Sequence, residues 1–317
     1  MKSALFCILT AFGLSLLFCV GLIPMLRRFK AGQNILSYVK EHKGKSGTPT
    51  MGGLAFISAA VLAAVFFIGQ ASRGVVLALI VGVAYMCVGL LDDFLKCKHK
   101  ENLGLKAWQK FSFQACIAVL VGIFCIKNGI TKTYLPFTQI VWDMGFFALP
   151  IIVLVFLGTV NAVNLTDGLD GLASSVSIPY FLSFALITAI QKGENGLSVI
   201  GFALVGALCA YLLFNVSPAR VFMGDTGSLS LGGFAACVGV FSENTLSIAV
   251  IGLPFVISVI SVLMQVIYYK VTGGKRIFLM APIHHHFQQK GYSESKISYA
   301  YFLITLLLGV LCVLALL

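Results

Sequence analysis

Residues 74–91 read GVVLALIVGVAYMCVGLL, and Asp92 and Asp93 follow them directly. The stretch contains no charged residue and is nearly as long as the ~20 apolar residues with which a helix crosses a bilayer. Ionised groups at the edge of a membrane are costly and usually serve a function. The stretch therefore predicts a transmembrane helix that delivers two carboxylates to one face of the membrane.

Apolar windows of this kind recur along the whole chain. The 317 residues are 59% hydrophobic and 10% charged, with a mean hydropathy of +0.99, which is typical of membrane proteins. We expect an all-α polytopic membrane protein, a single domain over 1–317 with about ten transmembrane helices. The expected spans are 3–23, 51–70, 74–91, 110–127, 144–162, 172–190, 196–214, 228–242, 246–269 and 298–317. Pro254 is expected to kink the ninth of them.

Basic residues predict the orientation of these helices. If the N-terminus lies outside, 17 of the 22 Lys and Arg residues fall on the inner side, as the positive-inside rule requires. We therefore expect both termini outside. Every acidic motif described below then falls on the inner side, which predicts an active site on the cytoplasmic face. The same bias explains the net charge of +11 without a nucleic-acid partner, because no extended basic patch with interleaved aromatic residues occurs.

The adjacent acids Asp92 and Asp93 are expected to close the third helix, with Lys96 one turn further on. Neighbouring carboxylates repel each other, which favours a bound metal ion, a cation or a retained proton. We interpret the pair as serving a metal or acting as a base on an acceptor substrate. The alternative is the solvated start of a loop.

The segment NAVNLTDGLDG at 161–171 also places acids at the end of an apolar run. Asp167 and Asp170 are three residues apart and share a face if the segment is helical, and no Lys or Arg in the segment can pair with them. Asn164 belongs to the same motif. The alternative is that these polar side chains cap two helices.

A third acid, Asp225, lies in NVSPARVFMGDTGS at 215–228. The glycines on both sides of it favour a metal-ligating carboxylate on an open loop. Asn215 begins the segment, and Phe222 either stacks on a base or lies at the membrane interface as an ordinary aromatic residue.

Two segments contribute candidate phosphate contacts. In KSGTPTMGG at 45–53, Lys45 can hold a phosphate, and N–H groups at a helix start suit anions; an ordinary helix start is the alternative. In PIHHHF at 282–287, His284 and His285 are interpreted as phosphate or diphosphate contacts. Three consecutive His cannot all face one metal in regular structure, and the loop lacks further ligands at zinc spacing.

Carboxylates, lysines and histidines gathered on one face of a membrane suit phosphoryl transfer with Mg²⁺. Catalysis of that reaction consists largely of positioning and charge neutralisation. The sequence contains no Walker loop, dinucleotide fingerprint or Ser nucleophile elbow. A site at the membrane surface indicates one lipid substrate and one soluble substrate.

Five strings, GTPTMGG, LDD, NAVNLTDGLDGLA, FMGDTGSL and PIHHHF, occur in this order and resemble the motifs of the bacterial phospho-N-acetylmuramoyl-pentapeptide transferase (MraY) family. The resemblance implies transfer of phospho-MurNAc-pentapeptide from UDP-MurNAc-pentapeptide to undecaprenyl phosphate, giving lipid I and UMP, with Mg²⁺ as cofactor. It also implies a multi-pass protein of the bacterial plasma membrane that contacts membrane lipids and forms a homodimer.

The resemblance further implies roles for individual residues. Asp225 is the expected Mg²⁺ ligand, and Asp92 is the expected base or acceptor-orienting group, with Asp93 beside it. The expected catalytic set is completed by His284. The expected substrate-binding residues are Lys45, Thr50, Lys96, Lys110, Asn164, Asp167, Asp170, Asn215, Phe222, Gln265 and His285. Direct attack by the lipid phosphate and a covalent phospho-enzyme on an Asp both remain open.

Three other functions compete with this one. A membrane pyrophosphate hydrolase would account for the acids but not for a polyprenyl acceptor. A polyprenyl-phosphate GlcNAc-1-phosphate transferase is the alternative within the superfamily, and the strings TPTMGG and PIHHHF disfavour it. A transporter or flippase is the alternative of another class. It would place ionisable residues at mid-helix depth, whereas the acids here are expected at helix ends.

Overall fold

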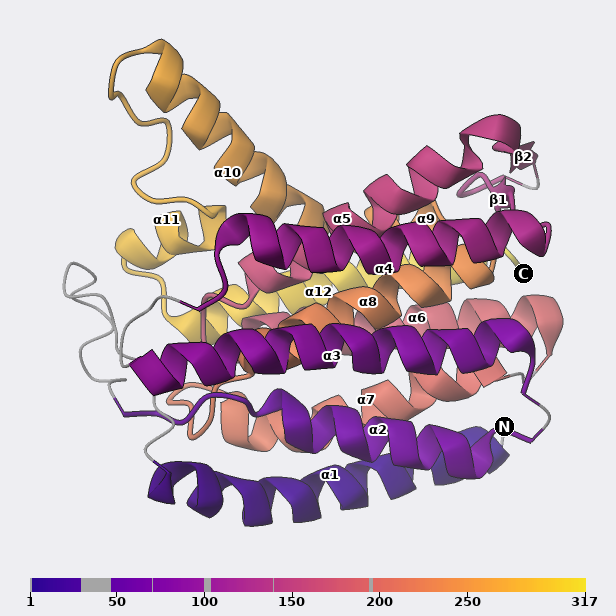
Figure 1. Cartoon of the computed structure of the whole chain (residues 1–317), viewed down its shortest axis with the longest axis horizontal. Helices are drawn as coiled ribbons and strands as arrows, with labels where there is room; N and C mark the ends of the chain where they lie inside the picture. Colours follow the sequence, from indigo (N-terminus) through magenta and orange to yellow (C-terminus); the bar gives the residue numbers. More distant parts are fainter. Residues whose placement is uncertain (1, 30–46, 70, 100–103, 139, 194–195) are drawn as a thin grey trace.

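The computed structural model describes residues 2–29, 47–69, 71–99, 104–138, 140–193 and 196–317. Helices dominate this part of the chain (Figure 1). The long helices are α1 (Lys2–Arg28), α3 (Arg73–His99), α4 (Ala107–Lys127), α5 (Ala148–Thr166), α6 (Leu172–Lys192), α7 (Gly196–Asn215), α8 (Gly224–Phe241), α10 (Leu253–Val271) and α12 (Glu294–Leu314). The shorter ones are α2 (Gly53–Phe67), η2 (Gly145–Phe147), α9 (Ser247–Ile251) and α11 (Ile283–Gln289).

The predicted membrane fold is confirmed. Among the described residues, 8 helices are long and apolar enough to cross a membrane: α1, α3, α4, α5, α6, α7, α10 and α12. The apolar α2, with 15 residues, and α8, with 18, complete the set of expected spans. Most expected boundaries agree with the helices to within a few residues, because long apolar runs are the strongest local signal for a membrane helix.

Helix α8 lies at the centre of the bundle, where it packs against α3 on one side and α5 on another. All of its residues except Asp225 are buried. Its glycines permit this packing: a Cβ on Gly232 would collide with the backbone of Val160 in α5. Small residues at helix contacts let backbones approach closely in membrane proteins. The Gly-rich character of this run therefore reflects its central position.

The expected ninth helix is broken rather than kinked. It separates at Gly252 into α9 and α10, two residues before Pro254. Pro254 lies in the first turn of α10, where its missing N–H removes no intrahelical hydrogen bond. Beyond the break α10 leans away from the other helices, and the chain returns through α11 (Figure 1).

A short hairpin, not predicted from the sequence, connects α4 to α5. Strands β1 (Lys132–Tyr134) and β2 (Val141–Asp143) pair antiparallel, with Thr133 opposite Trp142. The N–H of Tyr134 donates to the carbonyl of Glu243, at a distance of 2.7 Å, which ties the hairpin to the end of α8. Both chain termini and the hairpin lie at one end of the bundle, and the C-terminal end of α3 lies at the other (Figure 1).

Candidate active site

Asp92 and Asp93 lie inside α3 rather than at its end. The helix continues to His99, so the prediction that these acids close the helix is wrong by about two turns. Polar residues after Leu91 did not stop the helix because they pack against other parts of the protein. Both side chains are buried, with Asp92 2% and Asp93 0% exposed.

Asp93 binds the N-terminus of α8. Its Oδ1 accepts the N–H of Asp225 (3.2 Å), and its Oδ2 accepts both the N–H (2.9 Å) and the hydroxyl (2.7 Å) of Thr226. Free N–H groups and the helix dipole make the start of a helix a favourable place for a carboxylate. Asp93 thereby fixes the first turn of α8 against α3.

Asp225 lies in that first turn and not on an open loop, which corrects the expected setting of this residue. Its side chain is 12% exposed. Its Oδ2 accepts hydrogen bonds from Lys96 Nζ (2.7 Å) and Lys110 Nζ (2.9 Å), and its Oδ1 accepts one from Asn164 Nδ2 (2.6 Å). Four helices, α3, α4, α5 and α8, therefore meet at this carboxylate.

Asp92 completes the cluster. Its Oδ2 lies 2.6 Å from Lys96 Nζ, and its Oδ1 accepts the N–H of Leu105 (2.7 Å). Asp92, Asp93 and Asp225 each offer an oxygen within 4.8 Å of the others. Opposite ligands of an octahedral Mg²⁺ site are about 4 Å apart, so a small adjustment would let these oxygens share one ion. The donor set, all carboxylate oxygen, fits this hard cation.

Glycines set the close approach on which the cluster depends. A Cβ on Gly89 would collide with the carbonyl of Asp225. The backbones of α3 and α8 can therefore approach this closely only because position 89 has no side chain. A Cβ on Gly224, where φ is +70°, would collide with Asp93 and lie 2.7 Å from Thr50 Oγ1. Thr50 is thereby placed beside the cluster, and its buried hydroxyl has no hydrogen-bond partner among the described residues.

The segments 49–53 and 222–223 are joined by backbone hydrogen bonds. Phe222 N–H donates to the carbonyl of Pro49 (2.8 Å), and Gly52 N–H donates to the carbonyl of Phe222 (2.9 Å). Two motifs that are far apart in the sequence thus form one surface next to Asp225. Lys45, the remaining expected residue of the first motif, lies outside the described residues.

A second group of expected residues surrounds Gly168. A Cβ on Gly168 would lie 2.6 Å from His284 Nε2 and 2.8 Å from His285 Nε2. His284 is 0% exposed, and neither of its ring nitrogens has a hydrogen-bond partner among the described residues. Burial, with His285 adding to the effect, lowers the pKa of His284 to about 3. Its ring is therefore neutral at physiological pH.

The acids of the 161–171 segment have different settings. Burial raises the pKa of Asp167 well above its usual range, and the nearby carboxylates of Asp225 and Asp93 raise it further. The raised pKa favours the protonated form of Asp167, which can donate a hydrogen bond. Asp170 holds loops together: its Oδ2 accepts the N–H of Ala219 (3.0 Å), and its carbonyl accepts the hydroxyl of Ser298 (3.2 Å).

Two other expected residues also make internal contacts. Asn215 accepts the hydroxyl of Ser174 (3.0 Å) and donates to the carbonyl of Val221 (3.0 Å), beside Phe222. Gln265 Oε1 accepts the N–H groups at 277 (3.1 Å) and 278 (3.0 Å), so it anchors the segment that leads to α11. The structure gives no contact between Gln265 and the acid cluster among the residues it describes.

Several residues of the site were not expected from the sequence. Thr226 binds Asp93, and the hydroxyl of Ser228 accepts from Asn164 Nδ2 (2.8 Å). Both belong to the motif around Asp225, and a helical reading of that motif would have placed Ser228 one turn after Asp225. Gln288 and Glu294 lie next to His285 and Asp170, and no local pattern marks them.

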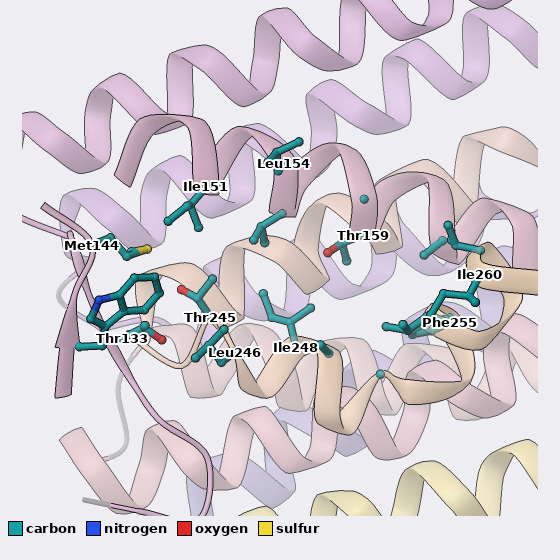
Figure 2. A pocket seen from close by; sticks show the side chains of 18 residues that line it. Thr133, Met144, Ile151, Leu154, Thr159, Thr245, Leu246, Ile248, Phe255 and Ile260 are labelled. Atoms are coloured by element: carbon teal, nitrogen blue, oxygen red, sulfur yellow. The ribbon is translucent and has the colours of Figure 1, made fainter. Parts of the chain in front are cut away.

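An apolar cavity of about 290 Å³ lies between α5, α9, α10 and the hairpin (Figure 2). Ile151 and Leu154 line it from α5, and Ile248 and Phe255 line it from α9 and α10. It extends along α5 as far as Ala162, two residues before Asn164 of the acid cluster. The cavity can accommodate part of an apolar chain.

Comparisons with known proteins agree with this geometry. Residues 75–243 match the family described as Glycosyl transferase family 4, and residues 45–57 match Phospho-N-acetylmuramoyl-pentapeptide-transferase signature 1. The Phospho-N-acetylmuramoyl-pentapeptide-transferase of Clostridium novyi is 42% identical over 97% of this chain and 95% of its own length. Those of Listeria monocytogenes (43% identical, 87% and 86%) and Heliobacterium modesticaldum (41%, 98% and 98%) are similar to the same degree. This chain therefore belongs to the phospho-N-acetylmuramoyl-pentapeptide-transferases of glycosyl transferase family 4.

Proposed function

We propose that this protein transfers phospho-MurNAc-pentapeptide from UDP-MurNAc-pentapeptide to undecaprenyl phosphate, with Mg²⁺, and releases lipid I and UMP. The observation that carries the proposal is the cluster of three carboxylates and two lysines at one end of a bundle of membrane helices. The names of the similar proteins support the identity of the donor.

In this reaction an oxygen of the lipid phosphate attacks the sugar-bound phosphorus of the donor. One P–O bond forms, the P–O bond to UMP breaks, and its electron pair leaves with UMP, so no water is consumed. Both oxygens of Asp93 already accept hydrogen bonds from α8, which supports direct attack over a covalent intermediate on this residue. Asp92, at the edge of the cluster, would orient or deprotonate the lipid phosphate.

A bound Mg²⁺ would neutralise the diphosphate and make UMP a better leaving group. Asp225 would hold it, while Asp93 would keep Asp225 in place. Lys96 and Lys110, which share the carboxylate of Asp225, would turn toward the phosphates of the donor. The three carboxylates and two ammonium groups carry a formal net charge of −1, which favours binding of a cation.

The donor's sugar and nucleoside would contact the second group of residues. His284 and His285 lie on the side of Gly168 where a side chain would project. Asp167 can donate a hydrogen bond to a phosphate or carbonyl oxygen. The ring nitrogens of His284, buried and unpartnered among the described residues, support a polar ligand here, because a buried polar group without a partner costs free energy.

The apolar cavity along α5 supports the proposed lipid acceptor. Its lining runs from Ile151 to Ala162 on the helix that also carries Asn164. With about 3.6 residues per turn, Ala162 and Asn164 lie on opposite faces of α5, so the helix separates this cavity from the acid cluster. A polyprenyl chain lying there would contact the apolar lining on the face of α5 opposite Asn164.

The orientation remains part of the proposal. The excess of Lys and Arg on the loops expected inside supports an acid cluster in the cytoplasm and both termini outside. The termini and the C-terminal end of α3 lie at opposite ends of the bundle (Figure 1), as this orientation requires. A reporter that works only in the cytoplasm can be fused to the C-terminus. Activity of that reporter would contradict this orientation. The homodimer stays a prediction, to be checked by the mass of the solubilised protein.

The purified protein, UDP-MurNAc-pentapeptide, undecaprenyl phosphate and Mg²⁺ test the proposal directly. Lipid I and UMP should appear in equal amounts, require both substrates and disappear with EDTA. If UDP-GlcNAc gives product with undecaprenyl phosphate and UDP-MurNAc-pentapeptide does not, the protein is a GlcNAc-1-phosphate transferase instead. Turnover with neither donor would refute the transferase activity and leave the transporter alternative to be tested.

A further inference from the structure

A short chain of side chains links His285 to the loop at 167–171. Glu294, at the start of α12, accepts the N–H of Asp170 through Oε2 (2.8 Å). Its Oε1 accepts a hydrogen bond from Nε2 of Gln288 on α11 (3.1 Å). Oε1 of Gln288 in turn lies 3.0 Å from His285 Nδ1. None of the five sequence motifs includes Gln288 or Glu294.

The chemistry of these groups fixes the directions of the three hydrogen bonds just described. An ionised carboxylate can only accept, so Gln288 must turn its NH₂ group toward Glu294. The carbonyl oxygen of Gln288 then faces His285, and this oxygen can also only accept. Nδ1 of His285 must therefore be the protonated nitrogen, because the hydrogen bond made by one ring nitrogen sets the tautomer.

We propose that Glu294, acting through Gln288, is a positioning residue that keeps a proton on Nδ1 of His285, so that Nε2 is the nitrogen that gains and loses a proton. Nε2 lies over the bare side of Gly168. It accepts a hydrogen bond when the ring is neutral and donates one to a phosphate oxygen when the ring is charged. The inference rests on the proposed function only in assigning this nitrogen to the phosphorylated donor.

Glu294 also fixes the opposite side of the same space. Asp170 is held at three points: its N–H by Glu294, its carbonyl by Ser298 and its Oδ2 by Ala219. One carboxylate therefore sets both the tautomer of His285 and the position of the loop that carries Gly168. A packing role would require only the volume of this side chain, whereas the proposed role requires two acceptor oxygens.

Glu294→Gln tests the requirement for two acceptors. The new amide has one acceptor oxygen; if that oxygen binds Asp170 N–H, the new NH₂ group faces Gln288. Gln288 must then reverse its amide and present NH₂ to His285, which moves the ring proton to Nε2. We expect the ¹⁵N NMR spectrum of His-labelled protein in bilayers, with 5 His in all, to show this inversion. Loss of one resonance pair in His285→Asn assigns the signal.

The exchanged double variant Gln288→Glu/Glu294→Gln provides the rescue. The carboxylate introduced at position 288 accepts from both His285 Nδ1 and the new NH₂ group, while the amide oxygen introduced at position 294 still accepts Asp170 N–H. The double variant should restore the Nδ1–H tautomer, and it should recover the kcat/KM for the donor that Glu294→Gln lowers by about tenfold or more. Gln289→Glu adds a carboxylate to the exposed side of α11, near Met280, and should change neither measurement.

A neutral wild-type His285 ring with its proton on Nε2 and none on Nδ1, or a tautomer unchanged by Glu294→Gln, would overturn the inference. So would a double variant that behaves no better than the single one. If Glu294→Gln does not fold, Gln288→Met is the second variant. It removes the acceptor from Nδ1, so the His285 ring should no longer hold its proton preferentially on Nδ1. Wild-type protein without UMP release would refute the proposed function, while the spectra would still decide the tautomer.

Discussion

Replacing the carboxylate of Asp225 by an amide should separate metal binding from folding. Asp225→Asn keeps the shape of the side chain but removes one charge from a position where Lys96, Lys110 and Asn164 all donate. One acceptor oxygen becomes a donor, so at least one of these three hydrogen bonds is lost. The cluster's formal net charge changes from −1 to 0.

The size of the effect on metal affinity follows from Coulomb's law. A unit charge about 4 Å from another, at an effective dielectric constant of about 20, contributes about 4 kcal/mol. The divalent ion doubles this attraction, and the loss of the two lysine contacts that compete for the same carboxylate offsets part of it. We take about 2–4 kcal/mol as the net loss, equivalent to a roughly 30- to 1,000-fold weaker affinity.

The assay is a titration of purified protein with Mn²⁺, followed by electron paramagnetic resonance, with Mg²⁺ as competitor. Asp225→Asn should shift the binding curve by the stated factor and abolish UMP release. Asp143→Asn, which changes an exposed acid of β2 at the other end of the bundle, is the matched control and should bind the ion as wild type does. An unchanged binding curve for Asp225→Asn in folded protein would refute the metal assignment.

Three further changes test the packing and protonation of the site. Gly89→Ala places a methyl group against the Asp225 carbonyl and should cost about 1–3 kcal/mol, seen as a lower melting temperature than that of Gly13→Ala, which has open space. Gly168→Ala should displace the His284 and His285 rings and lower kcat/KM for the donor roughly 10- to 100-fold; unchanged kinetics would place the donor elsewhere. Because the pKa of His284 is lowered from 6.5 to about 3, the unfolded state binds more protons between these values, so stability should fall as the pH decreases below 6.5. His284→Asn should show a shallower loss of thermal stability over that range, and equal slopes would contradict the buried neutral ring.

Hydropathy and charge alone were sufficient to predict the class of fold. Each apolar run is a local property of the chain, and a bilayer imposes the helix on it, because backbone groups in the hydrocarbon core must be satisfied within the segment. The break at Gly252 was less predictable. Pro254 indicated an irregularity, but it occupies the first turn of the second helix rather than the corner itself.

The candidate residues were also largely recognisable from the sequence, but their roles were not. Asp92 and Asp93 look equivalent in the sequence, yet Asp93 binds the start of α8 while Asp92 contacts Lys96. Asp167 and Asp170 look equivalent as well, yet Asp170 joins three segments. Burial and hydrogen-bond partners distinguish the members of each pair, and both come from distant parts of the chain.

The sequence by itself determined that the protein crosses a membrane several times and that its acids, lysines and histidines fall in a few polar segments. Only the tertiary structure decided that Lys96, Lys110 and Asn164 meet at Asp225, and that Glu294 reaches His285 through Gln288. The physical reason is that membrane insertion responds to the composition of each segment separately. The contacts at the site depend on how closely particular helix faces approach, and this is set by single glycines such as Gly89 against residues more than a hundred positions away.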